Sequence, residues 1–349
     1  MGAPIFVCRL RVTNAGGTWD SLNIDDPREQ PRIAGVVRRS LSQEPNTADV
    51  RVYNLAPDTV ARITGVVTTR LDWTPAERAQ LLAAGASTAP LELTSDGFGL
   101  GTIELSWGYA DSETIGNDGE LEAALGVGFI GQVTDGPREE RAGLDLVLRM
   151  LAQDAGHTLG AAEVVQQAGG GTVAHEGKSY AAGTRVSAIL GDMINAIGLS
   201  SDVSQLDSQL AAAFADKGYP LSDLVIGAGY NASGPVRPQI EALLRNLGLR
   251  WSIQNGDFLI LDSDSVIPGF APLDLGSDQL IGTPKEGAGT LEVSTAANPE
   301  ALPGRQVDVT TEGRRVSYRT EEAETPFDTY SGAQTDMKLQ ELQTIPGLF

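Results

Sequence analysis

The segment at residues 45–63 constrains the fold of this 349-residue chain more than any other. Between residues 48 and 53, alanine and valine alternate with polar side chains, which is the period-two pattern of a strand with one buried face. The chain then turns at Pro57 into a short helix over residues 59–63. Residues 32–39 predict a second strand that pairs with the first. This segment therefore predicts a strand, turn, strand and short helix, and it contains no catalytic group.

The same alternation recurs in short stretches near both ends of the chain. In the first part it predicts strands at 5–12, 33–37, 48–53, 101–110, 126–133 and 144–151. Short strands punctuated by Gly, Pro and Asn are typical of a small β-barrel or sandwich. A second set is predicted at 290–295, 306–310 and 315–319. The sequence leaves open how this second set closes.

Two insertions interrupt the first set of strands. Residues 71–85 predict a short helix, because Thr74 and Glu77 have the spacing of a capping box and Gly85 is a stop signal. Residues 111–122 are acidic and contain glycine, so we expect an exposed loop there.

The middle of the chain has helical periodicity. Apolar residues recur at helical spacing over 184–197, 202–215 and 236–247. A hairpin is predicted over 249–261, because Asn255-Gly256 is the strongest short-range hairpin signal in the chain. We also expect a small hairpin over 172–180 and a helix over 332–343.

These patterns predict an α+β protein that is mainly β, with two small β-barrel domains and a helical middle domain that carries a hairpin. The expected first barrel is 1–154, with a helical insertion near 74–85. The middle domain is expected at 155–265, and the second barrel with an acidic C-terminal tail at 266–349.

The chain is strongly acidic, with a formal net charge of −21. The charge is uneven, because residues 71–140 contain 13 acidic and 2 basic side chains. Such a field repels nucleic acid and anionic lipid, so binding to a phosphate backbone is not expected. Solubility is one explanation of the charge. The other is a surface over which nucleic acid passes without adhering.

Two further observations limit the class of protein. The sequence lacks a run of about 18 apolar residues, so we expect no transmembrane helix and no membrane contact. A single cysteine, Cys8, allows no internal disulfide, and its place in a predicted strand suggests a small buried side chain.

We find no pattern that predicts catalysis, a metal site or a cofactor site. The two histidines, His157 and His175, lack the carboxylate spacing of a metal triad. The segment 231–234 does not match the turn that presents a nucleophilic serine. Glu139 and Glu140 are neighbours in a charged turn, where a solvated surface is the simpler reading than a glycosidase pair.

Two glycine patterns and the four tryptophans also do not predict a binding site. The triplet at 169–171 lacks the Lys-Ser/Thr ending of a phosphate loop, and the pattern at 97–101 precedes a strand rather than a helix. Trp19, Trp73, Trp107 and Trp251 are scattered, which does not favour a platform for single-stranded nucleic acid.

Four motifs, taken in order, resemble the central hub proteins of phage tail baseplates, the group that includes the late control protein D family. They are PN-x-A-x-V-x-V-YNL-x-x-x-T from residue 45, W-GY followed by F-I-GQV and R-x-G-L-D-L-x-L, L-G-L-R-W-x-I-x-NG-x-F-L-I from residue 247, and LIG-TP followed by L-E-V-S, NP and L-PG. The resemblance runs from about Ile33 to about Val309. Where the family often has His-x-Gly-Asp, this chain has residues 323–326 as Ala-Glu-Thr-Pro.

The resemblance implies a structural virion protein rather than an enzyme. Three subunits, each with two similar barrels, would form a ring that joins a hexameric tail tube to a trimeric spike and lets DNA pass through its lumen. The implied partners are two further copies, the tail tube or tube-initiator protein, the spike, baseplate wedge proteins and the tape measure protein. Assembly would take place in the bacterial host cytoplasm, and the product would be the phage tail baseplate of the virion.

Two other functions are kept as alternatives. One is a receptor- or carbohydrate-binding protein of the tail tip, which binding to a glycan array would favour. The other is a tail-associated cell-wall hydrolase, which activity in a peptidoglycan zymogram would favour.

Overall fold

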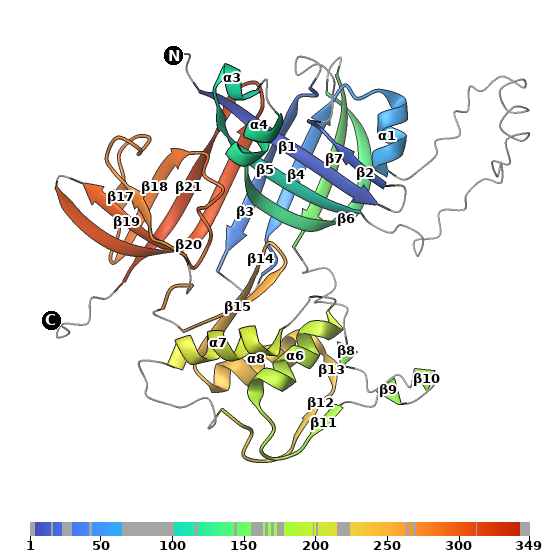
Figure 1. Cartoon of the computed structure of the whole chain (residues 1–349), viewed down its shortest axis with the longest axis vertical. Helices are drawn as coiled ribbons and strands as arrows, with labels where there is room; N and C mark the ends of the chain where they lie inside the picture. Colours follow the sequence, from blue (N-terminus) through green and yellow to red (C-terminus); the bar gives the residue numbers. More distant parts are fainter. Residues whose placement is uncertain are drawn as a thin grey trace, which may run out of the picture.

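The chain is described here by a computed structural model, shown in Figure 1. The described residues are 4–342 except for 15–16, 23–29, 42–43, 65–100, 116–117, 143–144, 155–162, 165–166, 169–170, 173–177, 198, 200–201, 215–223, 263–264, 268–269 and 312. Most of these residues lie in strands, and the helices gather mainly in the middle of the chain. The expected fold class, α+β and mainly β, is confirmed.

The N-terminal strands form a consecutive series of antiparallel pairs. In spatial order they are β3 (Ile33–Ser40), β4 (Thr47–Tyr53), β7 (Asp145–Gln153), β6 (Gly126–Ala142), β5 (Thr102–Ala110), β1 (Ile5–Asn14) and β2 (Gly17–Asp20). The alternation in β4 is confirmed, because Ala48, Val50 and Val52 are buried. The short helix that follows is α1 (Pro57–Thr64). The predicted strand–turn–strand–helix unit is therefore present.

The side chains on the inner face of these strands form one apolar core. It contains Leu10, Ile103, Leu105, Trp107, Phe129 and Met150, which are all at most 1% exposed. Cys8 lies in the same core, and burial raises the pKa of its thiol to about 12. The expectation that Cys8 is a small buried side chain is confirmed.

The C-terminal strands continue the same sheet. Their members are β16 (Leu273–Leu275), β17 (Lys285–Glu286), β18 (Thr290–Ala296), β19 (Gln306–Thr311), β20 (Arg314–Asp328) and β21 (Gly332–Glu341). A second apolar core lies between them and includes Leu291, Val307 and Leu339. The predicted pairing of 306–310 with 315–319 is confirmed by β19 and β20.

Strand β20 joins the two sets of strands. Its first half pairs with β19, its second half pairs with β3, and β21 runs beside it on the other side. The register with β21 shifts between Thr320 and Glu322, near the point where the partner changes from β19 to β3. The result is one 13-stranded sheet that extends from β17 to β2.

The continuous sheet crosses the domain boundaries that the sequence predicts at residues 154 and 266. Two residues from the C-terminal part, Ala297 and Phe327, belong to the core of the N-terminal strands. The two sets of strands are therefore continuous in hydrogen bonding and share core residues. The division into barrels at 1–154 and 266–349, with 155–265 between them, stays a prediction.

The middle of the chain forms a separate layer below the sheet in Figure 1. Its helices are α6 (Val186–Ala196), α7 (Val203–Phe214) and α8 (Val236–Asn246), and its hairpin is β14 (Leu249–Gln254) with β15 (Asp257–Asp262). Asn255 and Gly256 have φ values of 53° and 89°, which are the left-handed values that the predicted hairpin turn requires. The three helices and the hairpin enclose a core around Trp251. None of the described helices is long and apolar enough to cross a membrane.

Three local predictions are wrong. Residues 111–122 are not a loop, because they include α3 (Ser112–Ile115) and most of α4 (Asp118–Ala124), whose Leu121 is buried against the sheet. Residues 332–343 are not helical, because β21 occupies most of this stretch. In 172–180, the described ends pair elsewhere: β10 (Gly171–Thr172) pairs with β9 (Gln167–Ala168), and β11 (Lys178–Tyr180) with β12 (Tyr230–Ala232). The predicted helix at 71–85 lies outside the described residues.

Candidate functional site

The catalytic candidates that the structure describes do not come together into a site. His157, His175 and Trp73 lie outside the described residues. Glu140 is exposed on β6 and lies 3.8 Å from Arg149, as a solvated ion pair does. The segment 231–234 runs through β12 and into β13 (Gly234–Pro235), so its serine is not on a strand-to-helix nucleophile turn.

The three described tryptophans pack inside the protein rather than on its surface. Trp107 and Trp251 are fully buried, and Trp19 is 9% exposed, so these three rings offer nucleic acid no stacking surface. Within the described part of the chain, no group of three or more His, Cys, Asp or Glu is placed to hold a metal ion.

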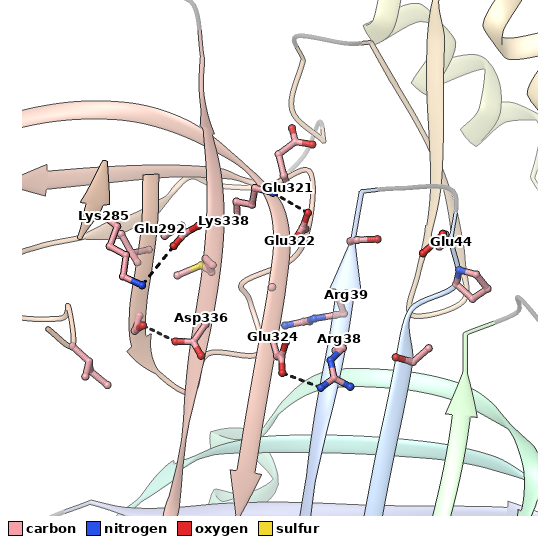
Figure 2. Close-up of a pocket in the computed structure, with 18 of the residues that line it drawn as sticks. Arg38, Arg39, Glu44, Lys285, Glu292, Glu321, Glu322, Glu324, Asp336 and Lys338 are labelled. Atoms are coloured by element: carbon pink, nitrogen blue, oxygen red, sulfur yellow. Dashed lines mark hydrogen bonds and ion pairs between the residues drawn. The ribbon is translucent and has the colours of Figure 1, made fainter. Parts of the chain in front are cut away.

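A groove of about 1090 Å³ lies along the exposed face of the shared sheet. Figure 2 shows its walls. The floor comes from β18, β21, β20 and β3, which include the strands of the junction between the two sets. The lining also includes Glu44, Pro45 and Thr47 before and at the start of β4, Arg250 from β14, and Ile281, Thr283 and Lys285 in and before β17.

Charged side chains cross the floor of this groove in register. Lys285 is opposite Glu292, Glu292 is opposite Lys338, and Lys338 is opposite Glu322. The sign therefore alternates from strand to strand, and opposite charges at facing positions stabilise a sheet. The Lys338–Glu322 pair is 3.3 Å long and the Lys285–Glu292 pair 3.9 Å.

A second row of charges runs beside the first. Arg38 lies 3.1 Å from Glu324, and the Ser294 hydroxyl donates to Asp336 at 2.5 Å. These ion pairs are exposed, so each contributes only a few tenths of a kcal/mol, up to about 1 kcal/mol. These pairs determine the electrostatic character of the groove, because Arg38, Lys285 and Lys338 each face a carboxylate. The face does not present the run of unmatched Lys and Arg that holds a phosphate backbone.

Beneath the groove floor, the buried side chain of Arg39 forms hydrogen bonds that connect the two sets of strands. It is 2% exposed, and its Nη1 donates to the backbone carbonyls of Gly128 at 3.0 Å and Pro299 at 3.3 Å. Its guanidinium lies 5.8 Å from the ring centre of Trp107. Burial lowers the pKa of Arg39 to about 10, so the group remains a cation at neutral pH.

Another arginine makes the same connection at the far end of β20. The Arg32 guanidinium lies 2.6 Å from the Asp328 carboxylate and 4.6 Å from the ring centre of Tyr53. It also lies 5.5 Å from the ring of Tyr330, which is 76% exposed in the turn between β20 and β21. The pairing with Arg32 keeps the pKa of Asp328 below its usual value.

Sequence reasoning did not identify Arg39 or this junction. The sequence signal for Arg39 was its position in β3. Arg39 lies on the same face of the strand as the buried residues Ile33 and Val37, where a charged side chain is unusual. The pairing of β20 with β3 had no local signal, since the paired residues lie almost 290 positions apart in the chain.

Comparisons with known proteins identify the class of fold. No family model and no curated protein sequence matches the chain. Among solved structures, the chain is similar to a 43 kDa tail protein of prophage MuSo2 from Shewanella oneidensis, with 9% identity, 96% of this chain and 98% of that chain covered, and a TM-score of 0.50.

Two further solved structures are similar with lower TM-scores. One is a tail protein from Neisseria meningitidis, with 10% identity, coverage of 97% and 96%, and a TM-score of 0.47. The other is an E. coli component of the type VI secretion system, itself described as similar to two tail proteins of bacteriophage T4, with 9% identity, coverage of 97% and 78%, and a TM-score of 0.47.

The likeness to the Shewanella protein shows that this chain has the fold of a phage tail protein. It extends over nearly the whole of both chains, so it includes the middle layer as well as the shared sheet. The fold that the sequence motifs implied is confirmed.

Proposed function

We propose that the chain is the central hub of a phage tail baseplate. Three copies would form a ring that joins the hexameric tail tube to the trimeric spike, and DNA would pass through the lumen during ejection. The observation that carries this proposal is the fold, which matches a prophage tail protein over 96% of the chain. Fold alone does not determine function, so the sequence motifs from residues 33 to 309 supply the second argument.

The shared sheet supports this role physically. A ring of three subunits needs two sets of strands in each subunit to present six units to a six-fold tube. Here the two sets are connected by β20 and by the contacts of Arg39 and Arg32. A hub that transmits force between tube and spike requires such a connection, and a closed ring also leaves few free sheet edges.

The charges support transit of DNA rather than binding. The net charge of −21 opposes capture of a polyanion, and the cations on the grooved face are matched by carboxylates. The proposed partners are therefore other proteins: the tube or tube-initiator protein, the spike, wedge proteins and the tape measure protein. The proposed location is the baseplate of the virion, after assembly in the host cytoplasm.

The first test is the mass in solution together with DNA binding. We expect light scattering to give three times the chain mass of 36.6 kDa, or 109.8 kDa, and a gel-shift assay with duplex DNA at physiological salt to show no complex. A complex with duplex DNA at that salt concentration would contradict transit without binding. Activity in a peptidoglycan zymogram would replace the hub with a hydrolase, and selective glycan binding by a monomer would replace it with a receptor-binding protein.

A further inference from the structure

The helical middle layer meets the shared sheet at a buried polar contact. The hairpin β14–β15 rises from the helices toward the ends of β3 and β7, as Figure 1 shows. Asn46, in the turn before β4, is 3% exposed, Asp154, just after β7, is 1% exposed, and Gln254, at the end of β14, is 4% exposed. We refer to these three residues as the joint.

Asn46 is the centre of the joint. Its side-chain Nδ2, which carries two hydrogens, lies within hydrogen-bond distance of three acceptors: Asp154 Oδ2 at 2.6 Å, the Ile253 carbonyl at 2.8 Å and Gln254 Oε1 at 3.0 Å. Its backbone N–H donates to Asp154 Oδ1 at 2.9 Å. One amide therefore connects a carboxylate on the sheet with two acceptors on the hairpin.

Two more hydrogen bonds complete the contact. The Ser40 N–H donates to Asn46 Oδ1 at 2.8 Å, and Gln254 Nε2 donates to the Ser40 carbonyl at 3.0 Å. The hairpin is thus held against β3 and the turn after it largely by polar groups. A small apolar cluster of Leu41, Leu261 and Ile267 lies beside them.

Among the described residues, no cation forms an ion pair with the carboxylate in the joint. Both groups that donate hydrogen bonds to Asp154 belong to Asn46, and the groups that face Asn46 from β14 are the uncharged carbonyl of Ile253 and amide of Gln254. The charged side chains that the structure describes on the adjoining turn and strands include Glu44 in the same turn and the pair of Arg250 on β14 with Glu321 on β20, 3.9 Å apart. None of these three is among the groups that set the charge state of Asp154.

We propose that the joint is a pH-sensitive hinge between the middle layer and the sheet, held more tightly when the Asp154 carboxyl is neutral than when it is ionised. Opening the hairpin away from Asn46 would return the carboxylate to water. Because an ionised carboxylate gains most from water, ionisation favours the open arrangement and protonation favours the closed one. This proposal does not depend on the hub assignment, since the contact lies within one chain.

The titration of Asp154 agrees with this geometry. Burial is the largest cause that acts on it and raises its pKa from 3.8 to about 7, against the opposing effect of the hydrogen bonds from Asn46. In the open arrangement the pKa returns to the ordinary range. The closed joint therefore binds the proton more tightly, and it loses stability as the pH rises from about 4 through about 7.

Hydrogen exchange at the joint tests the proposal directly. The amides of Ser40 and Asn46 donate to side chains that the hairpin covers in the closed joint, so we expect their exchange to rise when the hairpin moves away. With exchange rates corrected for intrinsic chemistry, we expect opening to rise on the order of 30-fold between pH 5.5 and 8.5 in the full chain. The amides of the β1–β5 pair, far from the joint, serve as the internal reference and should not show this rise.

Two variants make the test specific. Asp154→Asn removes the charge and should abolish the pH dependence at Ser40 and Asn46, whereas Asp336→Asn makes the same chemical change on the sheet face and should preserve it. The wild-type comparison stands even if Asp154→Asn fails to fold. Equal protection of the two amides at both pH values, or an equal rise in the β1–β5 reference, would overturn the proposal.

Discussion

Phe327 is the residue whose loss best tests whether β20 completes the N-terminal core. It lies in the C-terminal half of β20 and is 4% exposed. Its ring is stacked on Trp107 of β5, with the ring centres 6.3 Å apart and the planes inclined by 17°. It also lies over Gly35 of β3, where a Cβ would come within 2.9 Å of the phenyl ring.

The expected loss of stability in Phe327→Ala follows from these contacts. Truncation of a buried phenylalanine to alanine costs about 3–5 kcal/mol, and an aromatic pair contributes about 0.5–1.5 kcal/mol beyond its buried area. The strands on both sides are held by hydrogen bonds, so the space left in Phe327→Ala will not collapse freely. We therefore expect the free energy of unfolding to fall by about 4 kcal/mol.

The assay is urea denaturation followed by tryptophan fluorescence, because Trp107 reports on its own stacking partner. Tyr330→Ala is the matched control, since it removes an aromatic ring from the adjoining turn that is 76% exposed. We expect the control to change stability by less than about 1 kcal/mol. A loss below about 1 kcal/mol for Phe327→Ala would refute the view that the C-terminal strand is part of the N-terminal core.

Two other substitutions probe buried charges. Arg39→Ala should lower the free energy of unfolding by about 2–4 kcal/mol, because it removes the hydrogen bonds to the Gly128 and Pro299 carbonyls and leaves a space beside Trp107. Arg39→Met should recover a large part of that loss by refilling the space; a thermal or urea melt that ranks Ala above Met would contradict this. Asp154→Asn should make stability less dependent on pH: with a folded pKa of about 7 against 3.8 when unfolded, the wild type loses up to about 4 kcal/mol as the pH rises from 4 to 8. Melts at both pH values check this, and a wild type that gains stability over the same range would show that the sign is wrong.

Local patterns in the sequence predicted the parts of the fold that depend on neighbours in the chain. The alternation in β4 and the Asn255-Gly256 turn were sufficient, because the strand buries one face and the two turn residues have the positive φ values of a tight hairpin. Helix α8 was found for the same reason, with Gly248 after its end at a φ of 72°.

The failures occur where tertiary contacts decide. Residues 332–341 contain Ala, Gln, Met, Lys and Leu, which favour a helix, yet pairing with β18 and β20 on both sides makes them a strand. Residues 111–122 are acidic, but Leu121 packs on the sheet and Glu122 pairs with Arg9 at 2.9 Å, so the segment folds as helices.

The candidate groove and the joint could not be predicted from the sequence. The groove and the joint depend on contacts between residues far apart in the chain, such as Asn46 with Asp154 and Gln254. No local periodicity encodes those contacts, so they required the structure.

Negative-stain imaging of the purified chain is the most direct test of the hub assignment. The proposal predicts class averages of a three-fold ring with a central pore and six lobes around it, one for each set of strands. Particles of one subunit without a pore, at concentrations where light scattering also gives 36.6 kDa, would contradict it.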